Sequence, residues 1–263
     1  MEAKQVIVGL VCLAAAACSQ ETPHHFTHDV MNRMTPVKNQ GQSQTCWAYA
    51  MLAAIETEHI MRGDSVNLSA AYVEAMLSRE PQAPASKRGM GQTLLNMIGK
   101  YGIVAYDAMR TPEWPLPRRV FMYGAEYTPL EFAHSVCAPG EYVCLTSDGR
   151  QPYYRQITID TPDNWEGNRF HNLPIDTLLT LTEQAVSAGR GVSWESKSHA
   201  MAIVGLAHDE HQQPYFVMKN SWGTDRPHGG LEYLSYRKFR RLTLAVILPR
   251  DFVGQHLAHP LQE

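Results

Sequence analysis

Residues 36–50, which read PVKNQGQSQTCWAYA, lead from a loop into a segment with helical periodicity. From there, apolar side chains recur every three or four residues, as they do on one face of an α-helix. These positions are Trp47, Ala50, Met51, Ala54 and Ile55. Ser43 or Thr45 can cap the start of such a helix, and Gly63 is typical of its end. The stretch therefore predicts a helix that carries Cys46 in its first turn.

Cys46 would place its sulfur at the positive end of this helix. Unsatisfied amides and the helix dipole favour a thiolate over a thiol at that position. The dipole contributes about 0.3–1 kcal/mol, which changes the acidity of the thiol by less than about tenfold. A strong nucleophile near neutral pH also needs a neighbouring imidazolium. Without one, a buried and inert cysteine remains the alternative.

A predicted hairpin supplies the imidazole. The apolar runs 199–207 and 215–221 are separated by the turn-forming residues 209–214. His199 begins the first run and Asn220 lies near the end of the second, about equally far from the turn. Since such residues face each other in an antiparallel ladder, the Asn220 oxygen can hold one ring nitrogen of His199. The other ring nitrogen is then free to take a proton from a thiol.

Gln40 lies six residues before Cys46. A turn over residues 40–43 can bring its side-chain amide back over the start of the helix. There, with the Cys46 backbone N–H, it would stabilise the oxyanion of an acyl-transfer intermediate. A solvated glutamine in a loop is the alternative.

The rest of the chain suggests two regions that differ in their predicted secondary structure. Helices are predicted over residues 93–101 and 176–188, and further strands over residues 231–236 and 242–248. Residues 104–170 are rich in Pro, Tyr and Gly and are expected to be mostly loop. The outline is an α+β fold in which a helical lobe precedes a β-rich lobe, with a cleft between them.

Composition limits the classes of function. The 263 residues are 44% hydrophobic and 19% charged, with a net charge of −3 and no Lys/Arg-rich run. These values are ordinary for a globular protein and do not favour nucleic acid as a partner. Glycine patterns for phosphate or dinucleotide binding are absent from the sequence, and we expect no cofactor. Residues 24–28, HHFTH, could bind a metal, but they lie in an expected tether and we predict no metal site.

The N-terminus resembles an export signal. Residues 6–17 form an apolar run of twelve, too short to span a bilayer and suited to a signal peptide. Cys18 follows at the position where bacterial lipoproteins are cut and lipidated, so membrane attachment through a lipid on Cys18 is possible. The expected location is the bacterial cell envelope or the exterior. A frayed N-terminal helix of the mature protein is the alternative.

The sequence has five cysteines: Cys12, Cys18, Cys46, Cys137 and Cys144. Cys12 would leave with the signal peptide. Cys137 and Cys144 bracket a turn-forming stretch and could close a short loop, although their separation in sequence does not fix the geometry. Either way Cys46 has no obvious partner.

Three blocks of sequence resemble the papain-type cysteine peptidases. Residues 36–50 resemble their nucleophile segment, SHAMAIVG at 198–205 their histidine strand, and KNSWG at 219–223 their asparagine segment. The resemblance implies a papain-like two-lobe fold with the active site in the cleft. It also implies the roles of the site residues: Cys46 as nucleophile, His199 as base, Asn220 to orient His199, and Gln40 in the oxyanion hole.

The resemblance extends to substrate binding. It implies that Trp222 shields the His–Asn hydrogen bond, and that Gly89 pairs with the backbone of a peptide substrate. Met90 is then expected near a side-chain pocket. Arg88 replaces the first of two glycines in the family's pattern, and Ser43 stands where a disulfide cysteine is usual.

These features predict a peptidase that hydrolyses peptides or proteins through a thioester acyl-enzyme. A catalytically silent surface protein that binds peptides, and an enzyme that transfers the acyl group to an amine, are the alternatives. Only 21 residues separate Cys18 from Gln40, so no inhibitory propeptide is expected. That feature, with residues 172–176 and 239–253, resembles the bleomycin hydrolase and bacterial aminopeptidase C branch, and suggests aminopeptidase-like action.

The predicted organisation follows from these observations. We expect a signal peptide at 1–17, a polar tether at 18–30, a peptidase domain at 31–255 and a C-terminal tail at 256–263. Within the domain, the helical lobe is expected over about 31–125 and the β lobe over about 126–255.

Overall fold

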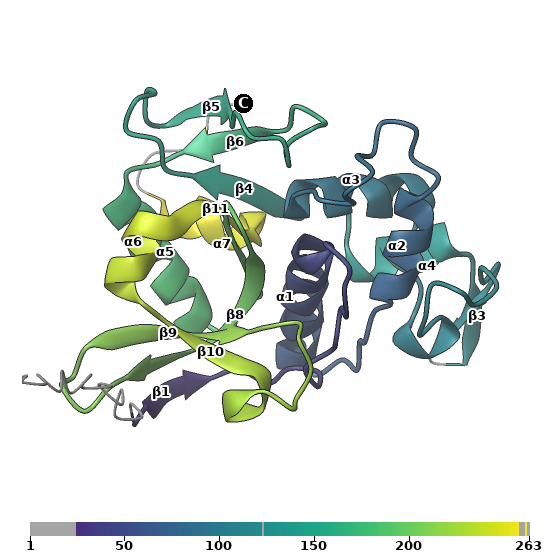
Figure 1. Ribbon diagram of the computed structural model, residues 1–263, viewed down its shortest axis with the longest axis horizontal. Helices are drawn as coiled ribbons and strands as arrows, with labels where there is room; N and C mark the ends of the chain where they lie inside the picture. The colour runs from purple at the N-terminus through teal and green to yellow at the C-terminus, as the bar shows by residue number, and fades with distance from the viewer. Residues whose placement is uncertain (1–24, 123, 258–260, 262–263) are drawn as a thin grey trace, which may run out of the picture.

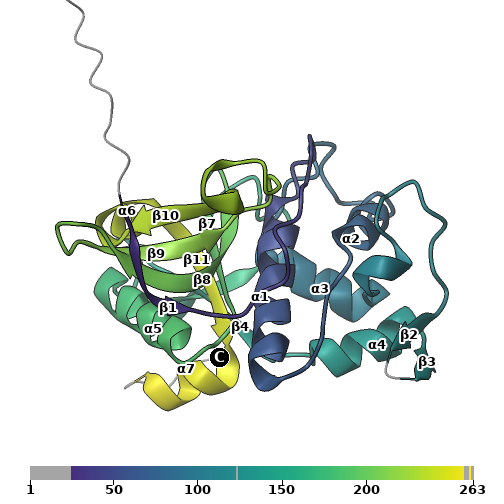
Figure 2. The same ribbon diagram turned by 90° about the horizontal axis from the view of Figure 1, so that it is seen from below.

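Helix α1, Cys46–Arg62, lies between a group of helices and a β-sheet in the computed structural model (Figures 1 and 2). The structure describes residues 25–122, 124–257 and 261. α1 contacts α3 (Gly91–Tyr101) on one side and the strands β7 (Val192–Ser196) and β8 (Ala200–His208) on the other. This position explains why the helix is buried almost all round.

The ends of α1 follow the prediction. Thr45 is the residue before the helix, and Gly63 ends it at a φ of 101°, which a residue with a side chain rarely adopts. The Thr45 side chain does not cap the helix, because its hydroxyl donates to Glu74 at 2.9 Å instead.

The helical lobe shares one core with α1. Its other elements are α2 (Ala70–Leu77), the 3₁₀ turn η1 (Tyr106–Ala108), the hairpin β2 (Val120–Met122) and β3 (Ala125–Tyr127), and α4 (Pro129–Val136). Leu52, Leu94 and Phe132, from three of these helices, are fully buried in this core.

The β lobe is built on one sheet with strand order β10-β9-β8-β7-β11-β4-β6-β5, and β1 pairs with β8. The remaining strands are β1 (Thr27–Met31), β4 (Tyr142–Thr146), β5 (Arg155–Thr158), β6 (Arg169–Asn172), β9 (Pro214–Lys219), β10 (Leu231–Ser235) and β11 (Thr243–Pro249). The pairs are antiparallel except for β4 with β6. The turn η2 (Pro227–Gly230) leads into β10.

The sheet is covered on both faces. On β11, Ala245 and Ile247 belong to the core around α1, whereas Val246 and Leu248 belong to a second core. This alternation is the period of two of a β-strand. The second core lies under α5 (Ile175–Ser187), α6 (Tyr236–Leu242) and α7 (Arg250–His256). The helices predicted over 93–101 and 176–188 are therefore confirmed as α3 and α5.

The prediction that residues 104–170 are mostly loop is confirmed, because most of the described residues in this range lie outside helices and strands. This region holds α4 and four short strands, including the fully buried β4. Thr128 and Glu131 form a capping box at the start of α4, with Pro129 at its first position. The helical core extends through Phe132 and Cys137, so the helical lobe reaches beyond the expected boundary near residue 125.

The polar tether also ends earlier than expected. Residues 27–31 form β1, which pairs with β8, so the sheet begins inside the segment 18–30. The expected signal peptide and Cys18 lie outside the described residues. At the other end, Leu257 and Leu261 pack against the second core. Within the described residues, no helix combines the length and apolar character needed to cross a membrane.

Candidate active site

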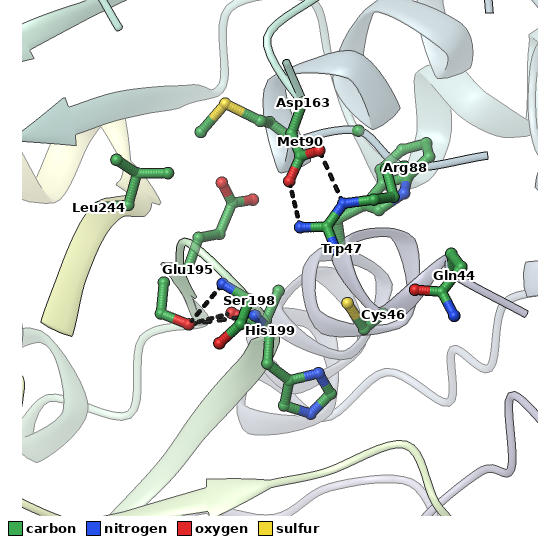
Figure 3. Close-up of a pocket in the computed structure, with 13 residues that line it drawn as sticks. Gln44, Cys46, Trp47, Arg88, Met90, Asp163, Glu195, Ser198, His199 and Leu244 are labelled. Carbon is green, nitrogen blue, oxygen red and sulfur yellow. Dashed lines mark hydrogen bonds and ion pairs between the residues drawn. The ribbon is translucent and has the colours of Figure 1, made fainter. Parts of the chain in front are cut away.

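Cys46, the first residue of α1, lines a pocket between the helical lobe and the sheet (Figure 3). The cavity has a volume of about 30 Å³. Its helical side includes Trp47, Gly89 and Met90, and its sheet side includes Glu195, His199 and Leu244. The predicted nucleophile and base therefore line the same cavity.

His199 and Asn220 are in contact, as predicted. Nε2 of His199 lies 2.8 Å from Oδ1 of Asn220. The pairing is diagonal, because the hairpin is centred on residue 211, which is farther from His199 than from Asn220. A bulge between Ile203 and Gly205 then shifts the register of β8 against β9 by one residue and reduces this offset. Ala202 pairs with Lys219, so continuing the ladder would place Met201, not His199, opposite Asn220. His199 reaches Asn220 because residues two apart share one face of a strand.

The surroundings hold this pair in place. The indole of Trp222 stacks on the His199 ring with 4.8 Å between centroids, and its shielding of the His–Asn hydrogen bond stays a prediction. Asn220 donates from its side-chain nitrogen to Glu232. With Nε2 directed to Asn220, the second ring nitrogen of His199, Nδ1, is left for proton exchange with the thiol.

Burial raises the pKa of the Cys46 thiol above its ordinary value. The backbone N–H groups of Ala200 and Trp47 donate to the sulfur and lower the pKa in part, while the Glu195 carboxylate raises it further. The helix start alone therefore does not produce a thiolate, and ionisation of Cys46 needs a proton acceptor. His199, the neighbour of Ala200, is the residue placed for this role.

Gln40 folds back over the turn before α1. Its side-chain nitrogen donates to the Ser43 carbonyl, and its side-chain oxygen accepts from the Ser221 hydroxyl. The backbone turn from Gln40 to Ser43 forms as expected, with Gly41 at a φ of 59°. The amide thus lies near the helix start, but no contact with Cys46 is observed, and its oxyanion role stays a prediction.

The segment 87–90 forms one wall of the pocket. Trp47 donates its indole N–H to the Lys87 carbonyl at 3.1 Å, and a Cβ at Gly89 would lie 3.0 Å from the Trp47 ring. Glycine at position 89 therefore lets the chain cross the indole closely. Met90 is almost fully buried beside the pocket, as expected.

Sequence reasoning missed three charged residues of this pocket. Arg88 forms a double hydrogen bond with Asp163, at 2.8 and 2.6 Å, and also donates to the Lys197 carbonyl at 3.0 Å. Glu195 lies on β7 and is 3% exposed. Arg88 could have been singled out, because it stands where the family's pattern has a glycine. No local sequence pattern indicated Asp163 or Glu195.

Glu195 is a buried carboxyl group at the start of α3. It accepts a hydrogen bond from the Gly91 backbone N–H. A Cβ at Gly91 would lie 2.9 Å from the same carboxyl oxygen, so glycine permits this approach. Burial raises the pKa of Glu195 to about 8; the Gly91 N–H opposes the rise and the Asp163 charge adds to it.

The raised pKa of Glu195 predicts that the stability of the protein depends on pH. A carboxyl group whose pKa is higher in the folded state favours folding most below its unfolded pKa of 4.5. Its contribution is lost as the pH rises from about 4.5 to about 8. We expect Glu195→Gln to flatten this part of the profile, measured as the free energy of unfolding in urea between pH 4.5 and 8. Parallel profiles for the wild type and the variant would contradict the assignment.

The other described cysteines are free. Cys137 and Cys144 are both buried and form no disulfide. Cys144 donates its thiol to Gln92 at 2.9 Å, and burial raises the pKa of Cys137 to about 12. No group of three His, Cys, Asp or Glu residues within the described segments could hold a metal ion. His28 instead contacts the Tyr233 hydroxyl at 2.8 Å, and His24 lies outside the described residues.

Comparisons with known proteins agree with this geometry. A family model described as papain family cysteine protease matches residues 22–241. The chain is 24% identical over 221 residues to the probable cysteine protease RD19C of Arabidopsis thaliana, covering 78% of this chain and 54% of that protein. It is 25% identical over 211 residues to the viral cathepsin of Epiphyas postvittana nucleopolyhedrovirus, covering 77% and 56%. The chain thus spans about half the length of these curated relatives.

A solved structure shows the fold. PepW from Lactobacillus rhamnosis superposes with a TM-score of 0.69 at 16% identity, covering 90% of this chain and 84% of that one. The match confirms the expected papain-like α+β fold, a helical part followed by an antiparallel sheet.

Proposed function

Because this chain belongs to the papain family of cysteine proteases, we propose that it hydrolyses peptide bonds with Cys46 as nucleophile. The observation that carries the proposal is the geometry of three residues. Cys46 and His199 line one pocket, and Asn220 holds Nε2 of His199 at 2.8 Å. This arrangement matches a nucleophile, its base and a group that orients the base.

The chemistry follows from these positions. His199 takes the proton of the Cys46 thiol at Nδ1, and the sulfur attacks the substrate carbonyl carbon. The tetrahedral oxyanion would receive hydrogen bonds from the Cys46 backbone N–H and the Gln40 side chain. His199 then donates its proton to the leaving amine, which yields a thioester. Water, activated by His199, releases the acid and restores the thiol.

Active-site labelling tests this proposal. We expect an epoxide inhibitor of thiol peptidases to modify the folded protein at Cys46, read by peptide mapping. Cys137 and Cys144 are buried and serve as internal controls that should stay unmodified. Folded protein with an unmodified Cys46 would refute the proposal. Peptide binding without turnover, unchanged in Cys46→Ala, would instead favour a silent peptide-binding protein.

We further propose that the chain shares features of the bleomycin hydrolase and bacterial aminopeptidase C branch and acts in an aminopeptidase-like way. The segments 172–176 and 239–253 support this proposal by their resemblance to that branch. Digestion of a mixed peptide library, with cleavage positions read by mass spectrometry, tests it. Removal of single N-terminal residues is expected to be faster than cleavage within N-terminally blocked peptides, and equal or faster cleavage of the blocked peptides would contradict the proposal.

Finally, we propose export and lipidation at Cys18. The apolar run 6–17 and the cysteine that follows support this proposal. When the full chain is expressed in a bacterium, we expect a membrane-bound form whose N-terminal residue is a lipidated Cys18. The Cys18→Ala variant should leave the membrane fraction. Identical distribution of both forms would contradict the proposal.

A further inference from the structure

We propose that Glu195 binds an ammonium group of the substrate, so that the pocket selects peptides carrying a lysine side chain or a free α-amine near the scissile bond. The inference rests on the proposed peptidase function and names a specificity determinant within it. The starting observation is a carboxyl group, 97% buried, that lines the pocket of the nucleophile. Its hydrogen-bond donor among the described residues is the Gly91 backbone N–H.

The charges around the pocket leave this carboxylate without a cation. The guanidinium of Arg88 is the positive group nearest the cavity, and both of its hydrogen bonds to a carboxylate go to Asp163. In Figure 3 the Arg88–Asp163 pair and the side chain of Glu195 border the same cavity. An ionised Glu195 therefore gives the pocket a surplus negative charge, and a buried charge without a partner is costly. A substrate cation would remove that cost.

The size of the cavity favours an ammonium group. About 30 Å³ accommodates roughly two water-sized groups. An ammonium has about the size of a water molecule, whereas a planar guanidinium is larger. Glu195 also lies close enough to raise the pKa of Cys46, so a cation on Glu195 would lie near the reacting sulfur.

An ammonium bound to Glu195 would offset the effect of the Glu195 carboxylate on the pKa of Cys46. A positive charge beside Glu195 cancels the repulsion between its carboxylate and a developing thiolate. Charge-assisted hydrogen bonds are the strong ones in protein interiors. We therefore expect kcat/KM to be about 10- to 100-fold higher for an ammonium-bearing peptide than for a neutral peptide of the same shape.

The experiment compares matched peptides on the wild-type protein. N-acetylated peptides carry lysine, norleucine or arginine at one position, moved from three residues before to two residues after the scissile bond. A second set carries norleucine throughout, with either a free or an acetylated N-terminus. Preference for lysine identifies the side chain as the source of the ammonium, and preference for the free N-terminus identifies the α-amine. Equal rates within both sets would overturn the proposal.

The pH dependence of the substrate preference also distinguishes a lysine side chain from a free α-amine as the source of the ammonium. Because burial raises the pKa of Glu195 to about 8, preference for an ammonium should increase as the pH rises toward 8. A lysine ammonium stays charged beyond that pH, whereas an α-amine loses its proton near about 8. The ionisable groups around Glu195 are Asp163, Arg88, Cys46 and Cys144. Their titration affects the cleavage of every peptide in the comparison, so it does not account for a difference between peptides.

The variant Glu195→Gln keeps an acceptor for the Gly91 N–H and removes the charge. We expect it to lose the preference while it still cleaves the acetylated norleucine peptide. The exposed Glu126→Gln is the matched control and should keep the preference. A uniform loss for all peptides in Glu195→Gln would instead assign Glu195 to the support of α3 and overturn the proposal.

A binding measurement keeps this test independent of catalysis. In the Cys46→Ala variant, calorimetry compares the Kd of the lysine and norleucine peptides and of the free and acetylated N-termini. Tighter binding of an ammonium-bearing peptide supports the role of Glu195 even if no peptide is cleaved, in which case the peptidase proposal alone fails. Cleavage without any such preference refutes the role of Glu195 and leaves the peptidase proposal intact.

Discussion

Replacing Cys46 by alanine is expected to lower kcat/KM for peptide hydrolysis by roughly four orders of magnitude or more. The variant removes the thiol that lines the same pocket as His199, and with it the thioester route. Alanine already occupies positions 48 and 50 of the same helix, so the fold should tolerate the change. The measurement is the single-turnover and steady-state rate on a fluorogenic peptide that the wild type cleaves.

The companion variant is His199→Ala. Since burial raises the pKa of Cys46, the thiol without His199 should stay protonated near neutral pH and react slowly. We expect a similar loss of activity and slower labelling of Cys46 by iodoacetamide. Cys137→Ala is the matched control, because that cysteine is buried away from the pocket and its loss should leave the rate nearly unchanged. Activity that survives in Cys46→Ala would refute the mechanism.

The site residues that sequence could predict are those attached to regular elements. Cys46 begins a helix with a clear apolar period, and His199 and Asn220 lie at the ends of two adjacent strands. Local rules for helix starts and hairpins are sufficient for such positions. Even here, the sequence did not show that the hairpin is centred on residue 211, so the contact is diagonal where a direct pair was expected.

The residues that sequence could not predict depend on distant packing. Arg88 and Asp163 are 75 residues apart, and Glu195 and Gly91 are 104 apart. A glutamate on a strand usually faces water, whereas this one is buried where β7 packs against the helical lobe and accepts from the Gly91 N–H at the start of α3. The short elements inside region 104–170 were not predicted for a different reason. Its strands are short, while the capping box at Thr128 and Glu131 was a local signal that could have identified α4.

A buried ionic cluster connects the two segments that carry the catalytic residues. Glu56 on α1 is fully buried and accepts hydrogen bonds from Lys38, Thr35 and the Leu68 backbone N–H. Lys219 lies 3.9 Å from the same carboxylate and donates to Thr35 at 2.7 Å. Lys38 is two residues before Gln40, and Lys219 is next to Asn220. The cluster thus fixes both ends of the site to one helix.

We expect Glu56→Gln to lower the free energy of unfolding by about 3–5 kcal/mol, because it leaves the buried Lys219 and the partly buried Lys38 without their anion. Burial lowers the pKa of Lys219 to about 8, while Glu56 acts in the opposite direction. The cost of burying this ammonium is therefore fully present below about pH 8 and is relieved as the pH rises toward the unfolded pKa of 10.5. The defect of Glu56→Gln should accordingly shrink above pH 8.

Urea unfolding at pH 7 and pH 9.5 measures both effects. The control is Glu126→Gln, an exposed glutamate of the helical lobe, which should change stability by less than about 0.5 kcal/mol. A loss below about 1 kcal/mol in Glu56→Gln would mean that water or a displaced side chain compensates the two lysines. An equal loss at both pH values would contradict the expected deprotonation of Lys219 between them.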